Sequence, residues 1–269
     1  MAGENITNQF NIGTATVMIG PMDKVFDLTP EEHSIGLVKN FTVTSQKTYT
    51  ELTAGTQSIV VDAQVTGNEI STSMEVYEYT ASNLAYGLGL DGSEYVTGEK
   101  FKLGADVTGG VSSTTISIAS SEDISSSFGA GQLVEIQNST DNRYDAVLVR
   151  EVASCSYSEG TLSVTLTEAI PAGWSFKTGD MVYTVNFIPV ASGETQPFLG
   201  AKVVGILPNG NEPVTIIFPK IRITNGFSVG FQADTYSNLP FEFKPYALTT
   251  DDPLYATYKN KGMFFVDKR

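Results

Sequence analysis

The sequence predicts an all-β protein with one short helix: an antiparallel β-sandwich or barrel interrupted by an inserted, small β-barrel-like domain. Apolar and polar residues alternate along much of the chain, one stretch has a clear helical spacing, and the composition changes in the middle. Alternation with a period of two is typical of strands that bury one face. Such strands suit an antiparallel sheet, because one of its faces can meet solvent.

Three segments show the alternation most clearly, and we expect each to be a half-buried strand. Polar residues occupy the second face of each segment, for example Asp62 and Gln64 in the first and Glu242 and Lys244 in the third. The apolar faces comprise Ile59, Val61, Ala63 and Val65; Phe227, Val229, Phe231 and Ala233; and Phe241 and Phe243.

The one convincing helical pattern follows Thr80, where Ala81, Leu84, Ala85 and Leu88 fall at i, i+3, i+4 and i+7. Thr80 is the expected N-cap, and the glycines at 87 and 89 are expected to end the helix. A second helix of one or two turns is expected to begin at residues 251–253, where two Asp residues and a Pro suit a helix N-terminus.

Residues 95–187 are crowded with Ser, Thr and Gly and contain an internal echo. Residues 128–134 and 176–182 both read F-x-x-G-[QD]-[LM]-V, and each motif follows an alternating strand, at 115–118 and 162–166. The echo indicates either a duplicated half of a small barrel or simply a common way for strands to begin. Both interpretations predict a compact β-module of residues 95–187, inserted into a discontinuous domain of residues 1–94 and 188–269.

The charge and hydropathy of the chain argue against two classes of partner. The formal net charge is −14, and the basic residues are scattered, whereas binding to nucleic acid depends on grouped Lys and Arg. The longest apolar runs, such as Val214 to Phe218, are too short to cross a bilayer. Residues 1–5 lack the basic and apolar regions of a signal peptide, so we expect no export or membrane segment.

Few residues are suited to catalysis or to metal binding, so we expect no enzyme, no cofactor and no metal ion. A single cysteine and a single histidine provide neither an internal disulfide nor a zinc cluster. His33 follows Glu31 and Glu32 in an expected loop after Pro30, where a solvated side chain is favoured over an acid–base catalyst. Cys155 lies in an expected strand at 152–157, where a buried thiol is favoured over a nucleophile.

The remaining polar and aromatic candidates also favour structural roles. The acidic pairs Asp141 with Asp145 and Glu122 with Asp123 lack the spacing of a calcium loop. Residues 109–110 and 129–131 are Gly-rich without the Lys of a phosphate loop, so we expect turns. Trp174 could stack on a sugar ring, but residues 171–173 favour a hairpin turn whose aromatic ring covers the core of the inserted module.

Residues 44–57 depart from the alternation. Beyond Thr44 both faces of this segment are polar, and Tyr49 and Leu52 are its only large apolar side chains. A hairpin of this kind cannot bury a core of its own. It is therefore either a floppy loop or an arm that becomes ordered against another subunit, and its many Thr residues suit extended structure.

Several motifs, taken in order, resemble those of phage major tail tube proteins. They are the polar hairpin with Thr53-Ala54-Gly55, the acidic strand at 74–79 that leads into residues 80–84, and the ending at 239–244. No single motif is specific, and it is their order that carries the resemblance. It covers the first 94 residues and roughly the last 70, and leaves the inserted module outside.

The resemblance implies a β-sandwich flanked by a helix, assembled into hexameric rings whose inner strands join into one barrel. Stacked rings would form a hollow tube in the virion tail, built in the host cytoplasm, through which double-stranded DNA passes without specific binding. Other partners would be tail and baseplate proteins and, in a contractile tail, a sheath. Contractile injection and secretion machines share the fold. The expected ring-stacking arm comprises Gln46, Lys47, Tyr49, Glu51, Leu52 and Thr53.

Two physical arguments agree with this resemblance, and two other functions compete with it. Closing sheets across subunits removes exposed strand edges, and an acidic wall repels DNA phosphates. The main alternative is a β-sandwich adhesin or carbohydrate-binding protein, which shares the strand pattern and would use Trp174. An enzyme working through two carboxylates, such as a glycosidase, is the third candidate.

Overall fold

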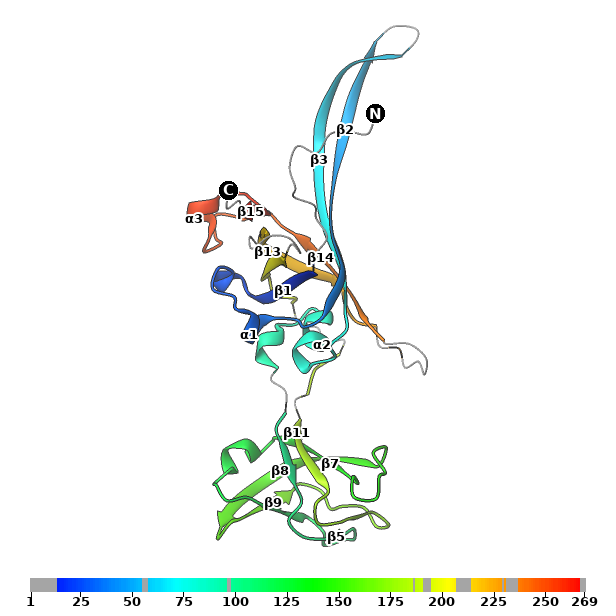
Figure 1. Cartoon of the computed structure of the whole chain (residues 1–269), viewed down its shortest axis with the longest axis vertical. Coiled ribbons are helices and arrows are strands. Elements are labelled where there is room, and N and C mark those ends of the chain that lie inside the picture. Colours follow the sequence, from blue (N-terminus) through cyan, green and yellow to red (C-terminus); the bar gives the residue numbers. More distant parts are fainter. Residues whose placement is uncertain are drawn as a thin grey trace. The chain divides into compact units, whose positions relative to one another are not determined.

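The computed structural model describes residues 14–54, 58–95, 98–185, 187–190, 195–206, 214–228, 230 and 237–266 (Figure 1). The chain divides into two compact units. Unit 1 comprises Met1–Tyr95 and Val190–Arg269, and unit 2 comprises Val96–Pro189. These bounds lie one or two residues from those expected for the discontinuous domain and the inserted module.

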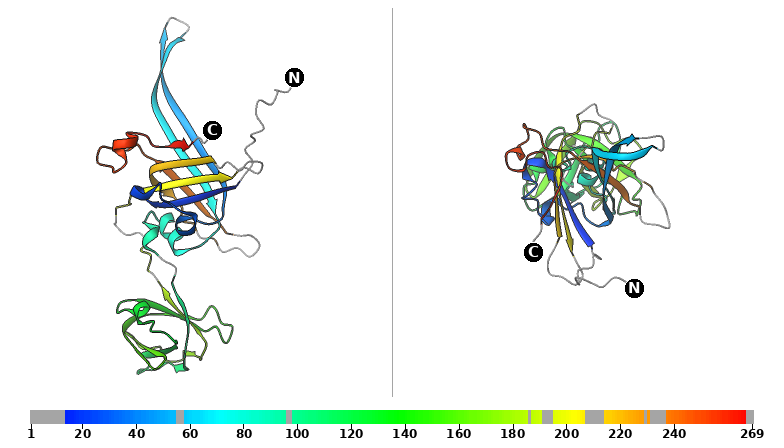
Figure 2. Two further views of the ribbon diagram at one scale, coloured as in Figure 1. Left: turned by 60° about the vertical axis from the view of Figure 1, so that its left-hand side comes forward. Right: turned by 90° about the horizontal axis from the view of Figure 1, so that it is seen from above.

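Unit 1 is built on one antiparallel sheet, shown from two sides in Figures 1 and 2. Its strand order is β1 (Thr14–Pro21), β12 (Leu199–Ile206), β13 (Val214–Asn225), β14 (Leu239–Pro245), β3 (Ile59–Val76) and β2 (Val38–Ala54). β15 (Phe264–Val266) pairs with the first part of β13. The all-β prediction is confirmed, but the described strands form one curved sheet rather than the two facing sheets of a sandwich.

The main core of unit 1 lies on one face of this sheet. Phe241 and Phe243 are fully buried there while Glu242 is exposed, so the predicted alternation of β14 is confirmed. The ring of Phe243 meets that of Phe218 on β13 edge-on, with centroids 5.2 Å apart. Further buried members of this core are Val17, Ile19, Met74, Val76, Val203, Ile221 and Leu239.

A smaller apolar cluster covers part of the opposite face, around Met18 on β1 and Ile217 on β13. The rings of Phe26, Tyr258 and Phe264 stack beside it, with centroids 5.1 to 6.0 Å apart. These contacts join the turn after the helix η1 (Met22–Lys24) to the C-terminal segment. The Lys220–Asp252 ion pair, 2.8 Å long with both side chains buried, fixes the same segment to β13.

The predicted helix is confirmed as α2 (Ala81–Gly87). The Thr80 hydroxyl accepts a hydrogen bond from the Asn83 amide at 3.1 Å, as an N-cap does. Gly89 has a φ of +81°, and the Leu90 amide donates to the carbonyl of Ala85 at 2.9 Å. This is the Schellman arrangement, which favours glycine because few other residues adopt a positive φ without strain.

Two helices of a single turn differ from expectation. α1 (Pro30–His33) stands where we predicted a loop, because Pro30 begins a turn closed by the His33 amide on the Thr29 carbonyl. α3 (Tyr255–Tyr258) begins two residues after Pro253. The carboxylate of Asp252 accepts hydrogen bonds from Thr249 and Lys220 and therefore does not cap that helix.

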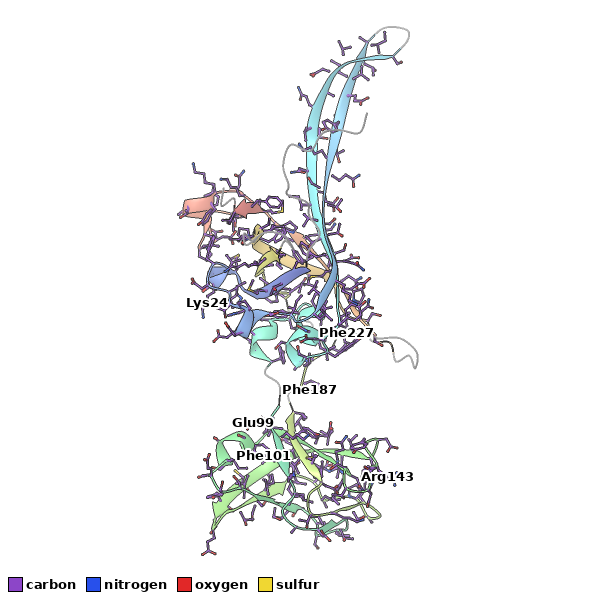
Figure 3. All side chains as sticks on the ribbon, in the orientation of Figure 1. Lys24, Glu99, Phe101, Arg143, Phe187 and Phe227 are labelled. Carbon is purple, nitrogen blue, oxygen red and sulfur yellow. The ribbon has the colours of Figure 1, made fainter. Side chains whose placement is uncertain are left out.

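The predicted strand at 227–233 lies largely outside the described residues. Its described residues, 227, 228 and 230, are not in a strand, because β13 ends at Asn225 and Gly226 turns against Gly87 of α2. Phe227, labelled in Figure 3, is 45% exposed. Val229, Phe231 and Ala233 are not described, and neither are residues 1–5.

Unit 2 contains a six-stranded antiparallel sheet whose two edges meet. The strand order is β4 (Lys100–Lys102), β11 (Met181–Val185), β7 (Leu133–Gln137), β8 (Val147–Ser158), β9 (Thr161–Leu166) and β6 (Thr115–Ala119). An isolated bridge between Leu103 and Ile118 joins the end of β4 to β6, the strand at the other edge. β5 (Val107–Thr108) pairs with β10 (Ser175–Phe176), and η3 (Ser125–Phe128) is a short helix of unit 2, whereas η2 (Gly92–Glu94) follows α2 in unit 1.

The two F-x-x-G motifs of unit 2 share three features, although Phe128 ends the helix η3 and Phe176 lies in the strand β10. Phe128 and Phe176 are both buried, and each motif's glycine has a positive φ, +87° at Gly131 and +94° at Gly179. The strands that follow, β7 and β11, pair with each other. Each motif therefore supplies one buried aromatic ring, one left-handed turn and one strand of the same sheet.

Asp180, which follows the second glycine, is a fully buried carboxylate in unit 2. It accepts hydrogen bonds from the Thr140 amide (2.8 Å), the Thr140 hydroxyl (2.7 Å) and the Lys177 amide (2.7 Å). Burial alone would raise the pKa of Asp180, but these hydrogen bonds outweigh burial and hold the pKa below its usual range. The carboxylate therefore joins the loop before β11 to the turn after β7.

We predict that Asp180→Asn makes unit 2 less stable at neutral pH and less sensitive to acid. A carboxylate whose pKa is lowered by folding stabilises the protein at pH values above its unfolded pKa of about 4. That stabilisation is lost as the pH falls through the pKa of the folded state. Because hydrogen bonds to a charged group contribute about 1.5–3 kcal/mol, unit 2 should lose roughly that amount at pH 7. Hydrogen exchange of unit 2 peptides between pH 7 and pH 3 measures both effects.

The exposed Asp145 in the same region provides the control, because Asp145→Asn should leave the stability and its pH dependence unchanged. Equal acid sensitivity in wild type and Asp180→Asn would show that another group controls the acid response.

Candidate assembly interface

The hairpin β2–β3 extends beyond the sheet of unit 1 (Figure 1). β3 pairs with β14 only over residues 72–76, whereas its pairing with β2 continues out to Ile59. Beyond residue 72 the hairpin therefore has two strands, and no other strand of the described ranges pairs with it. We call its outer part, residues 44–54 and 59–71, the arm.

Two β-bulges on β3 set which arm residues share a face. Tyr49 pairs with Val65, Glu51 with Ala63 and Leu52 with Asp62, but Thr53 pairs with Val60 because Val61 is an extra residue. A second shift leaves Thr66 as the extra residue between Gly67 and Val65. Cross-strand partners lie on the same side of a sheet, so Tyr49 and Leu52 occupy opposite sides of the arm.

The apolar side chains of the arm are exposed on both strands. Tyr49 is 53% exposed and Leu52 65%, and on the return strand Val61 is 63% and Val65 54% exposed. Figure 3 shows side chains projecting from both strands, and the rest of the described sheet of unit 1 lies beyond the base of the arm. Ile59 and Val60 are exposed as well, so the arm carries six large apolar side chains at its surface.

The prediction of a half-buried strand at 58–66 is therefore wrong for the subunit. The strand exists, as the outer part of β3, but its alternation does not face the core of unit 1. The bulge at Val61 also breaks the predicted face: Ile59 pairs with Ala54 and lies on the side opposite Ala63 and Val65. Sequence reasoning found Tyr49 and Leu52 but missed the apolar residues of the strand that pairs with them.

All six residues predicted for the stacking arm lie on the outer part of β2 and are exposed. Gln46 and Leu52 lie on one side of the arm, where they pair with Glu69 and Asp62 of β3. The other four residues lie on the second side. That second set is Lys47, Tyr49, Glu51 and Thr53. Residues 55–57, at the end of the predicted segment, lie outside the described part of the chain.

The base of the arm is tied to the body of unit 1. The hydroxyl of Thr72, which is 2% exposed, donates to the carbonyl of Phe243 at 2.9 Å. Three residues farther out along β3, Glu69 forms an ion pair with Lys244 of β14. Farther out, the side-chain hydrogen bonds are internal to the arm, as between Thr50 and Thr66.

The arm is thus fixed at one end and unsupported at the other. An isolated two-stranded hairpin is marginally stable at best in water. Burying an exposed Val or Leu side chain contributes about 1.5–3 kcal/mol, so covering several half-exposed side chains would offset much of the cost of ordering the arm. The arrangement is suited to binding another protein surface.

The residues considered as catalytic or sugar-binding candidates lie outside the arm and have local contacts. The His33 Nδ1 accepts a hydrogen bond from the Thr29 amide at 3.3 Å in the single turn of α1. Cys155 lies on β8, is partly buried against the core of unit 2, and has its Sγ 3.5 Å from the Ser125 carbonyl. Trp174 also packs on that core, 5.9 Å from the ring of Phe176, as predicted for a turn aromatic.

The acidic pairs are separated into different local contacts. Asp141 forms an ion pair with Lys177, whereas Asp123 accepts a hydrogen bond from the Ser125 amide at 3.0 Å. Within the ranges that the structure describes, no three His, Cys, Asp or Glu side chains gather as metal ligands. None of the helices in the described part of the chain has the length and apolar character needed to cross a membrane.

Comparison with known proteins adds no relative: the sequence matches no protein-family model, and no curated protein is significantly similar to it.

We predict that Thr72→Val destabilises unit 1 by about 0.5–1.5 kcal/mol, because it removes one buried hydrogen bond while keeping the side chain's shape. Ser73→Ala, at the exposed neighbouring position, should change stability by less than about 0.5 kcal/mol. Urea unfolding followed by circular dichroism measures both. Equal stability of the two variants would show that the contact between Thr72 and Phe243 does not fix the base of the arm.

Proposed function

We propose that this chain is a structural protein of a bacteriophage tail tube, which assembles into hexameric rings that stack head to tail. The arm carries the proposal: it exposes six large apolar side chains on a ribbon to which the described part of the subunit adds no third strand. Exposed apolar surface of this kind marks a site of protein association. The resemblance of the motifs before and after the inserted module supports the choice of a tube.

The arm favours an open polymer over a closed dimer. A surface that projects from one end of a subunit and meets a different surface on the next copy makes a heterologous contact, and such contacts repeat without limit. The outer strand edges of the arm supply further unpaired amides and carbonyls. Stacked rings satisfy both features, because each ring offers its arms to the next.

The charge of the chain fits a conduit for DNA. With 30 acidic and 16 basic residues, a tube of many copies would repel phosphates along its length. DNA would then pass through without specific binding. In this proposal the remaining partners are other tail and baseplate proteins, and the assembled protein belongs to the virion tail.

The adhesin or carbohydrate-binding alternative is less well supported. It would require Trp174 to present its ring to a sugar, whereas the ring packs on Phe176 and the core of unit 2. A compact binding protein would also have no use for an arm with exposed apolar residues on both sides.

Negative-stain electron microscopy of the purified protein at high concentration tests the proposal. We expect rings with sixfold symmetry and tubes made from them. Only single compact particles, at every concentration and also in material from purified phage particles, would contradict it.

We predict that Tyr49→Ser with Leu52→Ser abolishes polymerisation and changes the melting temperature of the subunit by less than about 2 °C. Neither side chain belongs to the core of unit 1, so the loss should fall on the assembly alone. Sedimentation velocity and thermal unfolding measure the two effects. Val111→Ser with Tyr144→Ser, which removes two exposed apolar side chains of unit 2, is the matched control.

Normal polymerisation of the Tyr49 and Leu52 double variant would eliminate the arm as the stacking element. Unfolding of that variant would show that these side chains stabilise the subunit itself.

We predict that deleting residues 96–189 and joining the ends with a short Gly-Ser linker leaves a subunit that still forms tubes. Unit 2 has its own core and its own sheet, so unit 1 should fold without it. Microscopy and circular dichroism check the outcome. Loss of all soluble folded protein would show that unit 1 depends on the insertion.

A further inference from the structure

A second exposed apolar surface lies on the same hairpin, at the end opposite the arm. Leu37, just before β2, is 54% exposed, and Tyr79, just after β3, is 40% exposed. The Tyr77 amide donates to the Leu37 carbonyl at 3.0 Å, and the Leu37 amide donates to the Glu78 carboxylate at 3.0 Å. These hydrogen bonds hold the two segments side by side.

Lys39 contributes a positive charge to this surface. Its Nζ lies 4.7 Å from the centroid of the Tyr77 ring, and it forms no ion pair with any residue that the structure describes. The neighbouring Glu75 accepts a hydrogen bond from the Tyr77 hydroxyl at 2.8 Å. We call Leu37, Lys39, Tyr77 and Tyr79 the base patch.

We infer that the base patch is the surface on which the arm of a second copy of this chain docks. The inference rests on the proposed function, because it names the receiving surface for the stacking arm. Its partner is the outer end of the arm, residues 49–54 and 59–65.

The chemistry of the two surfaces is complementary. Each side of the arm's outer end places a carboxylate beside a large apolar side chain: Glu51 follows Tyr49 on one side, and Asp62 pairs with Leu52 on the other. The base patch offers apolar and aromatic side chains beside the ammonium group of Lys39, which forms no salt bridge among the described residues; its cross-strand neighbour Glu75 is hydrogen-bonded to the Tyr77 hydroxyl. Opposite charges at the rim of an apolar contact favour one orientation and register.

Position also favours the base patch over β15, another element of unit 1 with exposed apolar side chains. Phe265 and Val266 are exposed on β15, but Figures 1 and 2 show β15 on the side of the sheet toward which the arm extends. The start of β2 lies at the opposite end, beside α2. A contact that repeats head to tail needs donor and acceptor at opposite ends of the subunit, and only the base patch meets that condition among these two.

Photo-cross-linking in the full-length protein tests the contact directly. A benzophenone amino acid replaces Thr53, which is exposed on the arm, and ¹⁴N- and ¹⁵N-labelled copies are mixed before assembly so that links between copies are recognised by mass. We expect links from the arm of one copy to peptides containing residues 35–39 or 75–80 of another. Links to β15, or to unit 2, would overturn the inference.

Complementation supplies a second readout. Leu37→Ser with Tyr79→Ser should block tube formation, as the Tyr49 and Leu52 double variant should, whereas Phe265→Ser should not. Because one double variant keeps its arm and the other keeps its base patch, mixing them should give complexes of two stacked rings but no long tubes. Sedimentation velocity separates these species.

The outcomes separate the inference from the proposed function. If wild type forms tubes and the Leu37 and Tyr79 variant does so equally well, the base patch is wrong while the tube stands. If wild type forms no ring or tube, both are wrong. Should that variant melt early, Lys39→Glu with Glu51→Lys replaces it: each change alone should reduce assembly, and their combination should restore it.

Discussion

The change of partners along β3 is the constraint on which unit 1 depends. Over residues 72–76 this strand lies between β2 and β14, and its side chains Met74 and Val76 are buried. From residue 71 outward it pairs with β2 alone, and a ribbon of two strands has no layer against which to bury a side chain. One continuous strand is thus core at one end and surface at the other.

The rest of unit 1 serves to hold that strand in place. The rings of Phe218 and Phe243 pack together on one face of the sheet, and α2 is capped at both ends. The Lys220–Asp252 ion pair fixes the C-terminal segment to β13. Burial would raise the pKa of Asp252, but hydrogen bonds from Lys220 and Thr249 lower it below its usual range, which favours the charged carboxylate. A rigid body at the base allows the arm to keep its direction while its outer end stays free for a partner.

Sequence reasoning succeeded where local pattern and burial coincide. The alternation of Phe241 and Phe243, the N-cap at Thr80 and the turn glycine at 89 are each determined by neighbours in sequence. The sequence-based predictions were wrong where a residue far away in the sequence determines the contact. Asp252 pairs with Lys220 rather than capping a helix, and nothing in the local sequence of either residue indicates the other.

The arm is a second case in which the local sequence does not determine the contacts of a residue. Ile59 to Val65 carry the pattern of a half-buried strand, and that pattern predicted burial in the subunit. Periodicity reports that a face is suited to burial but not which molecule covers it. Pairing the polar segment with a return strand of equal length would have placed residues 59–65 on the arm, although the bulge at Val61 that pairs Val65 with Tyr49 could not have been predicted.

The central claim is that the arm is completed by a neighbouring copy. Hydrogen exchange of the arm peptides, compared between isolated subunits and assembled protein, tests it most directly. Amides of residues 45–54 and 59–70 should exchange rapidly in the subunit, because only a marginal ribbon protects them, and slowly after assembly, while residues 72–76 stay protected in both. Equal exchange of the arm before and after assembly would contradict the account.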